Sequence, residues 1–341
     1  MINERYRLIS PRRVQVDFVD EKIGVNDVVI RPKYLSICAA DQRYFQGLRE
    51  QAVLSSKLPM CLIHEAVGEI VYDPKGEFEK KTMVVMVPNT PVETSELIKE
   101  NYLRSSKFRS SGFDGYMQQL VVINRDRVLP FTKIDGRVAA LLEMVSVSMN
   151  AYENYERVAI KKTPESIGVW GNGIVGFVTA LVLKKKLPNT KIYVLGIDEH
   201  RLHYFSFADA IYKIDELPEG FSVDHCFECV GGPSASSLAI NQMIDVIKPQ
   251  GVISLLGVSE TNVEINTRMV LEKGLTLVGH SRSGFDDFAK AIELLEENPE
   301  ITNYLETTIS NEVIVRCIED INQVFDIDRV NDFKTVMKWE M

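Results

Sequence analysis

The sequence predicts an α/β protein in which a β-rich domain is interrupted by a doubly wound parallel sheet. Short strand-like runs separated by Gly, Pro and Asp turns fill the first third of the chain. From Ser166 the pattern changes to strands that alternate with amphipathic helices, which is typical of a parallel sheet. The mixed sequence after Ser283 is too short for another domain, so we expect it to pack back on the first domain.

The elements follow from hydrophobic spacing. In the first domain, apolar runs predict strands at residues 27–30, 66–71, 83–87 and 116–123. In the parallel sheet we expect strands at residues 167–170, 192–195, 224–228, 252–256 and 275–278. The spacing i, i+3, i+4, i+7 predicts a helix with one buried face, formed by Ile240, Met243, Ile244 and Ile247. The predicted domains are therefore 1–146 with 284–341, and 147–283.

Composition excludes several classes of function. A net charge of -9 and a pI near 5.3 argue against a nucleic-acid-binding protein, because no basic stripe would offset phosphate repulsion. The N-terminal residues carry charges without an apolar run, so we expect no signal peptide, no membrane span and a cytoplasmic location. The five cysteines form no framework of repeated spacings, which fits a reducing compartment.

A glycine-rich turn opens the second domain. It reads Gly171-Asn172-Gly173-Ile174-Val175-Gly176, after a strand and before a helix. The first glycine permits the tight turn, the second lets the backbone approach a pyrophosphate, and the third allows close packing of helix and strand. Because strand, turn, helix and second strand appear in the required order, the sequence predicts dinucleotide binding here. The alternative is a turn that serves only packing.

The cofactor prediction depends on the end of the second strand. An acid is expected there when the adenosine ribose carries free hydroxyls, but the position is Gly196. Without a carboxylate a 2′-phosphate meets no repulsion, and Arg201 is available to pair with it. We therefore expect NADP(H) rather than NAD(H). The alternatives are that Arg201 is a solvated helix charge and that Asp198 still holds the ribose.

Potential zinc ligands lie in the first domain. Cys38 follows one strand, His64 and Glu65 precede another, and Glu143 could supply a further carboxylate. Thiolate, imidazole and carboxylate suit Zn²⁺, and a catalytic site leaves one position open for water or substrate. Taken singly, each residue is more typical of a core filler or a hydrogen-bonded structural group.

These motifs in this order resemble the zinc-dependent medium-chain dehydrogenase/reductases. The resemblance implies a GroES-like catalytic domain interrupted by a Rossmann domain, with Cys38, His64, Glu65 and Glu143 around one zinc ion per chain. No second, structural zinc is expected, because residues 88–112 contain no cysteine. The resemblance also implies that Tyr44 lies beside the substrate. Ala40 replaces the usual proton-relay hydroxyl, so the proton is expected from Tyr44 or from water held by Glu65.

Residues 38–44, 108–112 and 281–284, together with Gly196, resemble one branch of this family, the ribulose-5-phosphate reductases. That resemblance implies reversible, NADPH-dependent reduction of D-ribulose 5-phosphate to D-ribitol 5-phosphate, which feeds CDP-ribitol synthesis for teichoic acid or capsule. It also implies a homodimer and a complex with ribitol-5-phosphate cytidylyltransferase.

A sugar phosphate needs local cations, because a buried dianion is costly without charge-assisted hydrogen bonds. Arg109, within a serine-rich loop ending at Gly112, and Arg282 are the main candidates, with Lys334 a further one. Two other functions remain open. One is an NAD-dependent zinc polyol dehydrogenase acting on an unphosphorylated substrate, and the other is a non-catalytic dinucleotide-binding protein.

Overall fold

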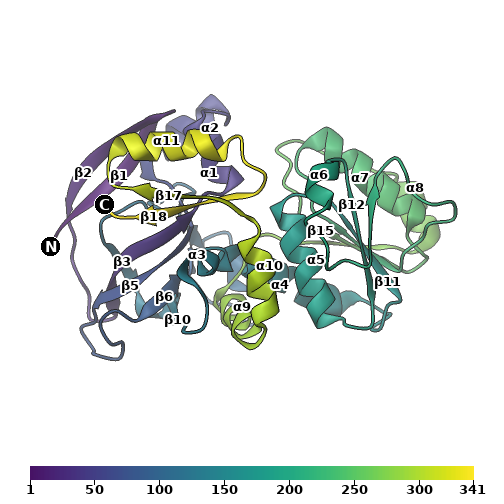
Figure 1. The fold of residues 1–341 in the computed structure, drawn as a ribbon, viewed down its shortest axis with the longest axis horizontal. Helices are drawn as coiled ribbons and strands as arrows, with labels where there is room; N and C mark the ends of the chain where they lie inside the picture. Colours follow the sequence, from purple (N-terminus) through teal and green to yellow (C-terminus); the bar gives the residue numbers. More distant parts are fainter. The chain divides into compact units, whose positions relative to one another are not determined.

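The computed structural model describes all residues, Met1–Met341, and divides into two compact units. Met1–Ser146 and Ser283–Met341 together form the first, which we call the outer unit. Val147–Arg282 form the second, the nested unit. In Figure 1 the purple N-terminal strands and the yellow C-terminal strands accordingly share one unit, while the teal and green segment forms the other. The α/β class with an interrupted β-rich domain is confirmed.

A seven-stranded sheet organises the outer unit, in the order β10-β6-β5-β3-β18-β17 with β9 paired to β3. Its strands are β3 Asp27–Ser36, β5 Glu65–Tyr72, β6 Met83–Met86, β9 Val121–Asn124, β10 Val128–Pro130, β17 Ile309–Val315 and β18 Lys334–Trp339. The C-terminal β18 runs antiparallel to β3, with Val336 opposite Ser36. The segment after Ser283 therefore completes the first sheet, as expected. The strand predicted over 116–123 is confined to its last residues.

A second sheet of the outer unit has the order β2-β1-β4, and a short pair joins β7 to β8. Their bounds are β1 Ile2–Ser10, β2 Arg13–Asp20, β4 Met60–Cys61, β7 Asn89–Thr90 and β8 Lys107–Phe108. The sequence analysis did not predict β1, because charged residues interrupt its apolar positions. Tyr6 and Leu8 are nevertheless buried, while Arg7 pairs with Asp17 and Asp114. A half-buried strand tolerates this alternation.

Short helices cover the sheets of the outer unit. They are α1 Ala39–Phe45, α2 Gln51–Lys57, α3 Gly136–Ala139, α9 Phe285–Glu297, α10 Pro299–Glu306, α11 Ile318–Asp328 and the 3₁₀ turns Glu100–Tyr102 and Arg125–Arg127. Helix α11 buries Ile321, Val324 and Phe325 in the core. The Phe325 ring stacks on Phe45 of α1 with 4.2 Å between centroids, which fixes α1 at the end of β3.

The nested unit is built on a six-stranded parallel sheet in the order β13-β12-β11-β14-β15-β16. Its strands are β11 Ser166–Trp170, β12 Lys191–Gly196, β13 Ala210–Lys213, β14 His225–Glu228, β15 Val252–Leu255 and β16 Thr276–Gly279. Its helices are α5 Ile174–Lys186, α6 Glu199–Leu202, α7 Pro233–Val246 and α8 Thr267–Lys273, and α4 Leu142–Val158 enters from the outer unit. This strand order is that of the Rossmann fold. No helix is both long and apolar enough to cross a membrane.

Candidate active site

Cys38, His64 and Glu65 come together in the outer unit. Cys38 lies two residues after the end of β3 and is the N-cap residue of α1, while Glu65 is the first residue of β5. Strands β3 and β5 are antiparallel neighbours with Ser36 opposite Glu65, so the end of one strand lies beside the start of the other. As a result, one potential ligand atom from each of the three residues lies within 4.8 Å of the other two.

The donor set fits zinc. A thiol, an imidazole and a carboxylate are ligands that Zn²⁺ accepts, and three protein ligands leave a fourth position open, as catalytic zinc sites do. His64 and Glu65 are buried and Cys38 is partly buried, so the cluster is shielded from bulk water. Burial without a metal would be costly for polar groups held this close, which is a physical reason to expect an ion here.

Asp41 contacts the cluster through His64, a role that the sequence did not indicate. It is fully buried in the first turn of α1, and its Oδ2 lies 3.5 Å from Nδ1 of His64. Burial opposes charge on both groups, but their mutual attraction lowers the pKa of Asp41 and raises that of His64. A carboxylate on one ring nitrogen orients the imidazole and leaves Nε2 to bind a metal.

Asp41 is itself held in place by neighbouring donors. Its Oδ1 accepts hydrogen bonds from Oγ of Ser110 at 2.5 Å and from the backbone N of Ile63 at 3.0 Å. Ile63 has φ of 72°, in the left-handed region that β-branched residues rarely adopt. Ile63 therefore holds a backbone conformation that glycine adopts more readily. The hydrogen bond to Asp41 is one of the contacts that stabilise it.

Lys334 is a second residue whose role the sequence did not reveal. Its Nζ lies 2.8 Å from both carboxylate oxygens of Glu65 and donates a 2.6 Å hydrogen bond to the carbonyl of Ile37. Burial disfavours the charged lysine, but Glu65 and Cys38 raise the pKa of Lys334 above its ordinary value. Only 2% of Lys334 is exposed, and its positive charge stabilises Glu65. Its suggested role as a substrate-phosphate cation stays a prediction.

Glu143 lies in the first turn of α4, within the outer unit. It does not belong to the three-residue cluster, although its charge interacts with His64, Glu65 and Lys334. Burial, together with Glu65, raises the pKa of Glu143 to about 7 against the attraction of His64. Its assignment as a fourth ligand stays a prediction.

The remaining substrate candidates have defined surroundings. Tyr44 is 4% exposed, with the Arg49 guanidinium 5.0 Å from its ring centroid. Arg109 donates to the carbonyls of Asp114 and Val122, so two of its terminal nitrogens already have backbone acceptors. Arg282 has φ of 59°, and its carbonyl accepts a hydrogen bond from Asn150 of the nested unit. The proposed roles of Tyr44, Arg109 and Arg282 toward the substrate stay predictions.

The glycine turn of the nested unit has the geometry that the sequence suggested. Gly171 has φ of 110°, and a Cβ there would lie 2.6 Å from the carbonyl oxygen of Cys229. A Cβ on Gly176 would lie 1.8 Å from the carbonyl oxygen of Gly171, whereas one on Gly173 would meet nothing within 4 Å. The first and third glycines are thus required by the protein's own packing. Gly173, with Ile174 and Val175 following in α5, leaves open space where a pyrophosphate would approach.

The end of β12 explains why no acid stands at position 196. A Cβ on Gly196 would lie 2.3 Å from Cγ of Asn172, whose Nδ2 donates a 2.5 Å hydrogen bond to the carbonyl of Asp198. The space that an acidic side chain would need is therefore filled by the turn itself. Nε of Arg201 lies 3.6 Å from Oδ2 of Asp198, at the surface of the same end of the sheet.

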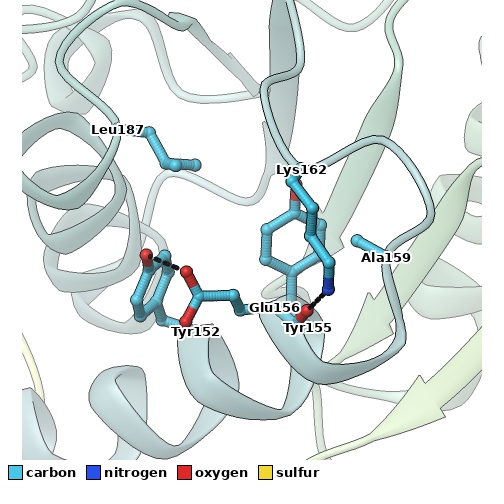
Figure 2. Close-up of a pocket in the computed structure, with 6 residues that line it drawn as sticks. All are labelled: Tyr152, Tyr155, Glu156, Ala159, Lys162 and Leu187. Atoms are coloured by element: carbon cyan, nitrogen blue, oxygen red, sulfur yellow. Dashed lines mark hydrogen bonds between the residues drawn. The ribbon is translucent and has the colours of Figure 1, made fainter.

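A small pocket also occurs in the nested unit, between the end of α4, the segment before β11 and Leu187. Figure 2 shows Tyr152 hydrogen-bonded to Glu156, and Lys162 donating to the Glu156 carbonyl. The flanking segments precede β11 and β12, so this pocket lies at the amino ends of the strands. Dinucleotides bind beyond the carboxyl ends. We therefore do not include this pocket in the candidate site.

Comparison with known proteins agrees with the fold and the site. Residues 24–133 match the alcohol dehydrogenase GroES-like domain, and residues 136–339 match the glucose dehydrogenase C-terminus. The chain is thus a zinc-type medium-chain dehydrogenase/reductase. It is 48% identical to ribulose-5-phosphate reductase of Bacillus spizizenii and 49% identical to ribulose-5-phosphate reductase 1 of Staphylococcus aureus, with 100% of each chain covered. The chain belongs to the family of ribulose-5-phosphate reductases.

A solved structure supports the same relationship. The crystal structure of S. aureus TarJ in complex with NADPH has 45% sequence identity and a TM-score of 0.89, and the match covers 100% of both chains. The present chain therefore shares the fold of a protein whose structure was determined with NADPH bound.

Proposed function

We propose that this protein is an NADPH-dependent, zinc-assisted reductase that converts D-ribulose 5-phosphate reversibly to D-ribitol 5-phosphate. The observation that carries the proposal is the buried Cys38-His64-Glu65 cluster, in a chain that matches named ribulose-5-phosphate reductases over its full length. The Rossmann sheet and its glycine turn supply the second requirement, a binding site for the hydride donor.

Cys38, His64 and Glu65 would hold the zinc ion, with Glu143 as a further candidate. When bound, zinc acts as a Lewis acid on a carbonyl oxygen. Asp41 orients the His64 ring, and Lys334 balances the charge of Glu65, so two of the three ligands are held by buried partners. The protein thus supplies a preformed, charge-balanced set of donors.

The nested unit would hold the cofactor, which supplies hydride. The turn from Gly171 to Gly176 presents the start of α5 to its pyrophosphate. Because the side chain of Asn172 fills the space at Gly196, that position carries no carboxylate, and Arg201 lies at the same end of the sheet, next to Asp198. The preference for NADPH follows from this arrangement.

The remaining assignments belong to the same proposal. Tyr44, or water held by Glu65, would deliver the proton, since Ala40 has no hydroxyl. Arg109 and Arg282 would bind the substrate phosphate. We propose that the product serves CDP-ribitol synthesis for teichoic acid or capsule and that the reaction takes place in the cytoplasm. We propose that the enzyme is a homodimer there and associates with ribitol-5-phosphate cytidylyltransferase.

The test is NADPH oxidation with D-ribulose 5-phosphate, compared with unphosphorylated D-ribulose and with NADH. We expect turnover with the phosphorylated ketose and NADPH, and little with either replacement. Preferred use of NADH and plain ribulose would instead identify an NAD-dependent polyol dehydrogenase. Binding of NADPH without turnover of any ketose would identify a non-catalytic protein.

A further inference from the structure

Glu228 is a buried carboxylate at the centre of the nested sheet to which neither the fold nor the zinc chemistry assigns a role. It is the last residue of β14 and only 1% exposed. One carboxylate oxygen accepts hydrogen bonds from the backbone N of Val230 at 2.8 Å and from Oγ of Ser236 at 3.3 Å. The other accepts from the backbone N of Gly257 at 2.8 Å. Every one of these donors belongs to a loop or helix end beyond the strands.

The carboxylate adds side-chain hydrogen bonds to two loops that backbone hydrogen bonds also join. One loop, residues 229–232, follows β14, and the other, residues 256–258, follows β15. The carbonyl of Glu228 also accepts from the backbone N of Leu256 at 2.9 Å, and Gly232 donates to the carbonyl of Val258 at 3.1 Å. A Cβ on Gly257 would lie 2.3 Å from Oε1 of Glu228, so that loop is closed directly over the carboxylate.

The first of these loops also contacts the glycine turn. The backbone N of Cys229 donates a 2.8 Å hydrogen bond to the carbonyl of Trp170, the last residue of β11. The carbonyl oxygen of Cys229 would lie only 2.6 Å from a Cβ on Gly171. The position of the loop after β14 therefore sets one wall of the space above the glycine turn.

Strand order shows which half of the cofactor this wall faces. Strand β12, with Gly196, lies on one side of β11, and β14 and β15 lie on the other. In this fold the two sides bind the two mononucleotide halves, and the ribose selected at the end of the second strand belongs to adenosine. The loops joined by Glu228 therefore border the nicotinamide half.

We propose that Glu228 is a positioning residue for the nicotinamide half of the cofactor, acting through the loops after β14 and β15 and not by touching the cofactor. The inference rests on the proposed function only in taking NADPH as the cofactor. By this inference, Glu228 affects the affinity for the nicotinamide end of the cofactor and leaves the contacts to its phosphates and adenosine unchanged.

The test compares two ligands on Glu228→Gln. NADPH spans both halves of the site, whereas adenosine 2′,5′-bisphosphate occupies only the adenosine half. Glutamine keeps the shape, but its NH₂ cannot accept from a backbone N–H, so a loop donor is left unmet. We expect the Kd for NADPH to rise roughly tenfold while the Kd for adenosine 2′,5′-bisphosphate stays unchanged. The kcat for ribulose 5-phosphate should also fall.

Asp224→Asn is the matched control, because Asp224 directly precedes the other end of the same strand. It is 5% exposed and accepts hydrogen bonds from the backbone N of Glu165 and Ser166. Its substitution should lower thermal stability without changing the ratio of the two Kd values. If Glu228→Gln yields too little folded protein, Ser236→Ala removes one weaker donor and should shift the same ratio in the same direction by a smaller factor.

Equal weakening of both ligands, or of neither, in Glu228→Gln would overturn the inference while wild-type turnover leaves the proposed function standing. Failure of the wild-type protein to bind NADPH would overturn the proposed function and this inference with it. A changed ratio in Asp224→Asn of the same size would also overturn it, since general loss of stability would then explain the effect.

Discussion

At the scale of single residues, the candidate metal centre depends on partners that do not bind the metal. His64 faces Asp41, and Glu65 faces Lys334, each at hydrogen-bond or ion-pair distance. Both partners are almost completely buried. The strength of metal binding should therefore respond to changes at Asp41 even though this residue is not expected to contact the ion.

We expect Asp41→Asn to weaken zinc binding by about 10- to 100-fold, because the amide no longer holds the imidazole with a full negative charge. Competition with a chromogenic chelator measures the affinity directly. Asp114→Asn is the control, since Asp114 is a partly buried acid of the same unit that pairs with Arg5 and Arg7 and not with a cluster residue. Equal zinc affinity in the two variants would contradict the role given to Asp41.

Lys334→Ala should lower the free energy of unfolding by about 3 kcal/mol or more, because it leaves the buried Glu65 carboxylate without its cation. Urea denaturation of the metal-free protein measures the change, because a bound zinc ion would itself neutralise Glu65. Lys338→Ala is made in the same strand, where the side chain is 41% exposed and pairs with Glu340. That variant should change stability by less than about 1 kcal/mol. Similar losses in both variants would show that the Lys334–Glu65 pair contributes no more to the free energy of unfolding than an exposed pair.

The sequence pointed to some of these residues and not to others for a physical reason. Cys38, His64 and Glu65 are chemically distinctive, and their order along the chain resembles a known pattern. Asp41 could have been found, because an acid three residues after the cysteine falls in the first turn of the following helix. Lys334 could not, since its contact with Glu65 depends on β18 pairing with β3 from nearly 300 residues away.

At the scale of elements, two glycines of the turn have different roles. Gly176 is needed for packing, and we expect Gly173 to be needed for cofactor binding. Gly176→Ala should destabilise the nested unit by about 2 kcal/mol, because the added Cβ would lie 1.8 Å from the carbonyl oxygen of Gly171. Gly173→Ala should change stability by no more than about 1 kcal/mol, since no atom lies within 4 Å of its Cβ position. It should nevertheless weaken NADPH binding about tenfold or more by filling the pyrophosphate space.

Thermal unfolding and NADPH fluorescence titration measure the two effects separately. Normal NADPH affinity in Gly173→Ala would contradict the position assigned to the pyrophosphate. A stable Gly176→Ala variant would show that the turn and helix α5 can separate enough to admit a methyl group.

The start of β14 gives a prediction for pH. Two lysines and two backbone N–H groups surround Asp224, and although burial opposes it, they lower the pKa of its carboxyl to about 2 from the ordinary 3.8. A lowered pKa stabilises the folded state above the ordinary value, and this stability is lost as the carboxyl is protonated. We expect about 2 kcal/mol to be lost between pH 4 and pH 2.

Urea denaturation across this pH range, with Asp224→Asn as the reference, isolates the contribution. The variant should be less stable at neutral pH and should lose less stability on acidification. Parallel pH profiles for the two proteins would show that Asp224 does not titrate as proposed.

Helices and strands were predictable where one hydrophobic periodicity dominates the local sequence. Five of the six nested strands are short, apolar and separated by helices, so their positions in the sequence agree with the structure within a few residues. The sixth, β13, was not predicted, because none of its residues is fully buried. Strand β1 was missed because Arg5 and Arg7 alternate with its buried positions and are satisfied by acids distant in sequence. Residues 116–118 are buried and 119–120 partly buried, but most of them are not paired as a strand, a difference that hydrophobicity cannot reveal.

At the scale of the whole molecule, the two units have separate hydrophobic cores. One core includes Phe45, Ile63 and Phe325 of the outer unit, and the other includes Trp170 and Met243 of the nested unit. The interrupted order was predictable in outline, because the sequence after residue 283 is too short to form a third core. The pairing of β18 between β3 and β17 was not, since no local pattern encodes a partner strand.

Metal removal should therefore act on one unit. We expect chelation to accelerate amide hydrogen exchange in β5, α1 and β18, because these elements carry or support the metal ligands. Exchange in β11, β14 and β15 should stay unchanged, and NADPH should protect those strands instead. Hydrogen-exchange mass spectrometry resolves the segments. Equal acceleration in both sheets would contradict a metal site confined to the outer unit.

The central position of β18 also determines when the metal site can mature as the chain is synthesised. Residues 147–282 are contiguous, so the nested unit can fold as soon as they have left the ribosome. The outer sheet must wait, with β3 and β5 already made, until β18 arrives from the opposite end of the chain. Glu65 gains its buried cation only at that moment. We therefore expect zinc to be acquired late in synthesis, after the nested unit can already bind its nucleotide.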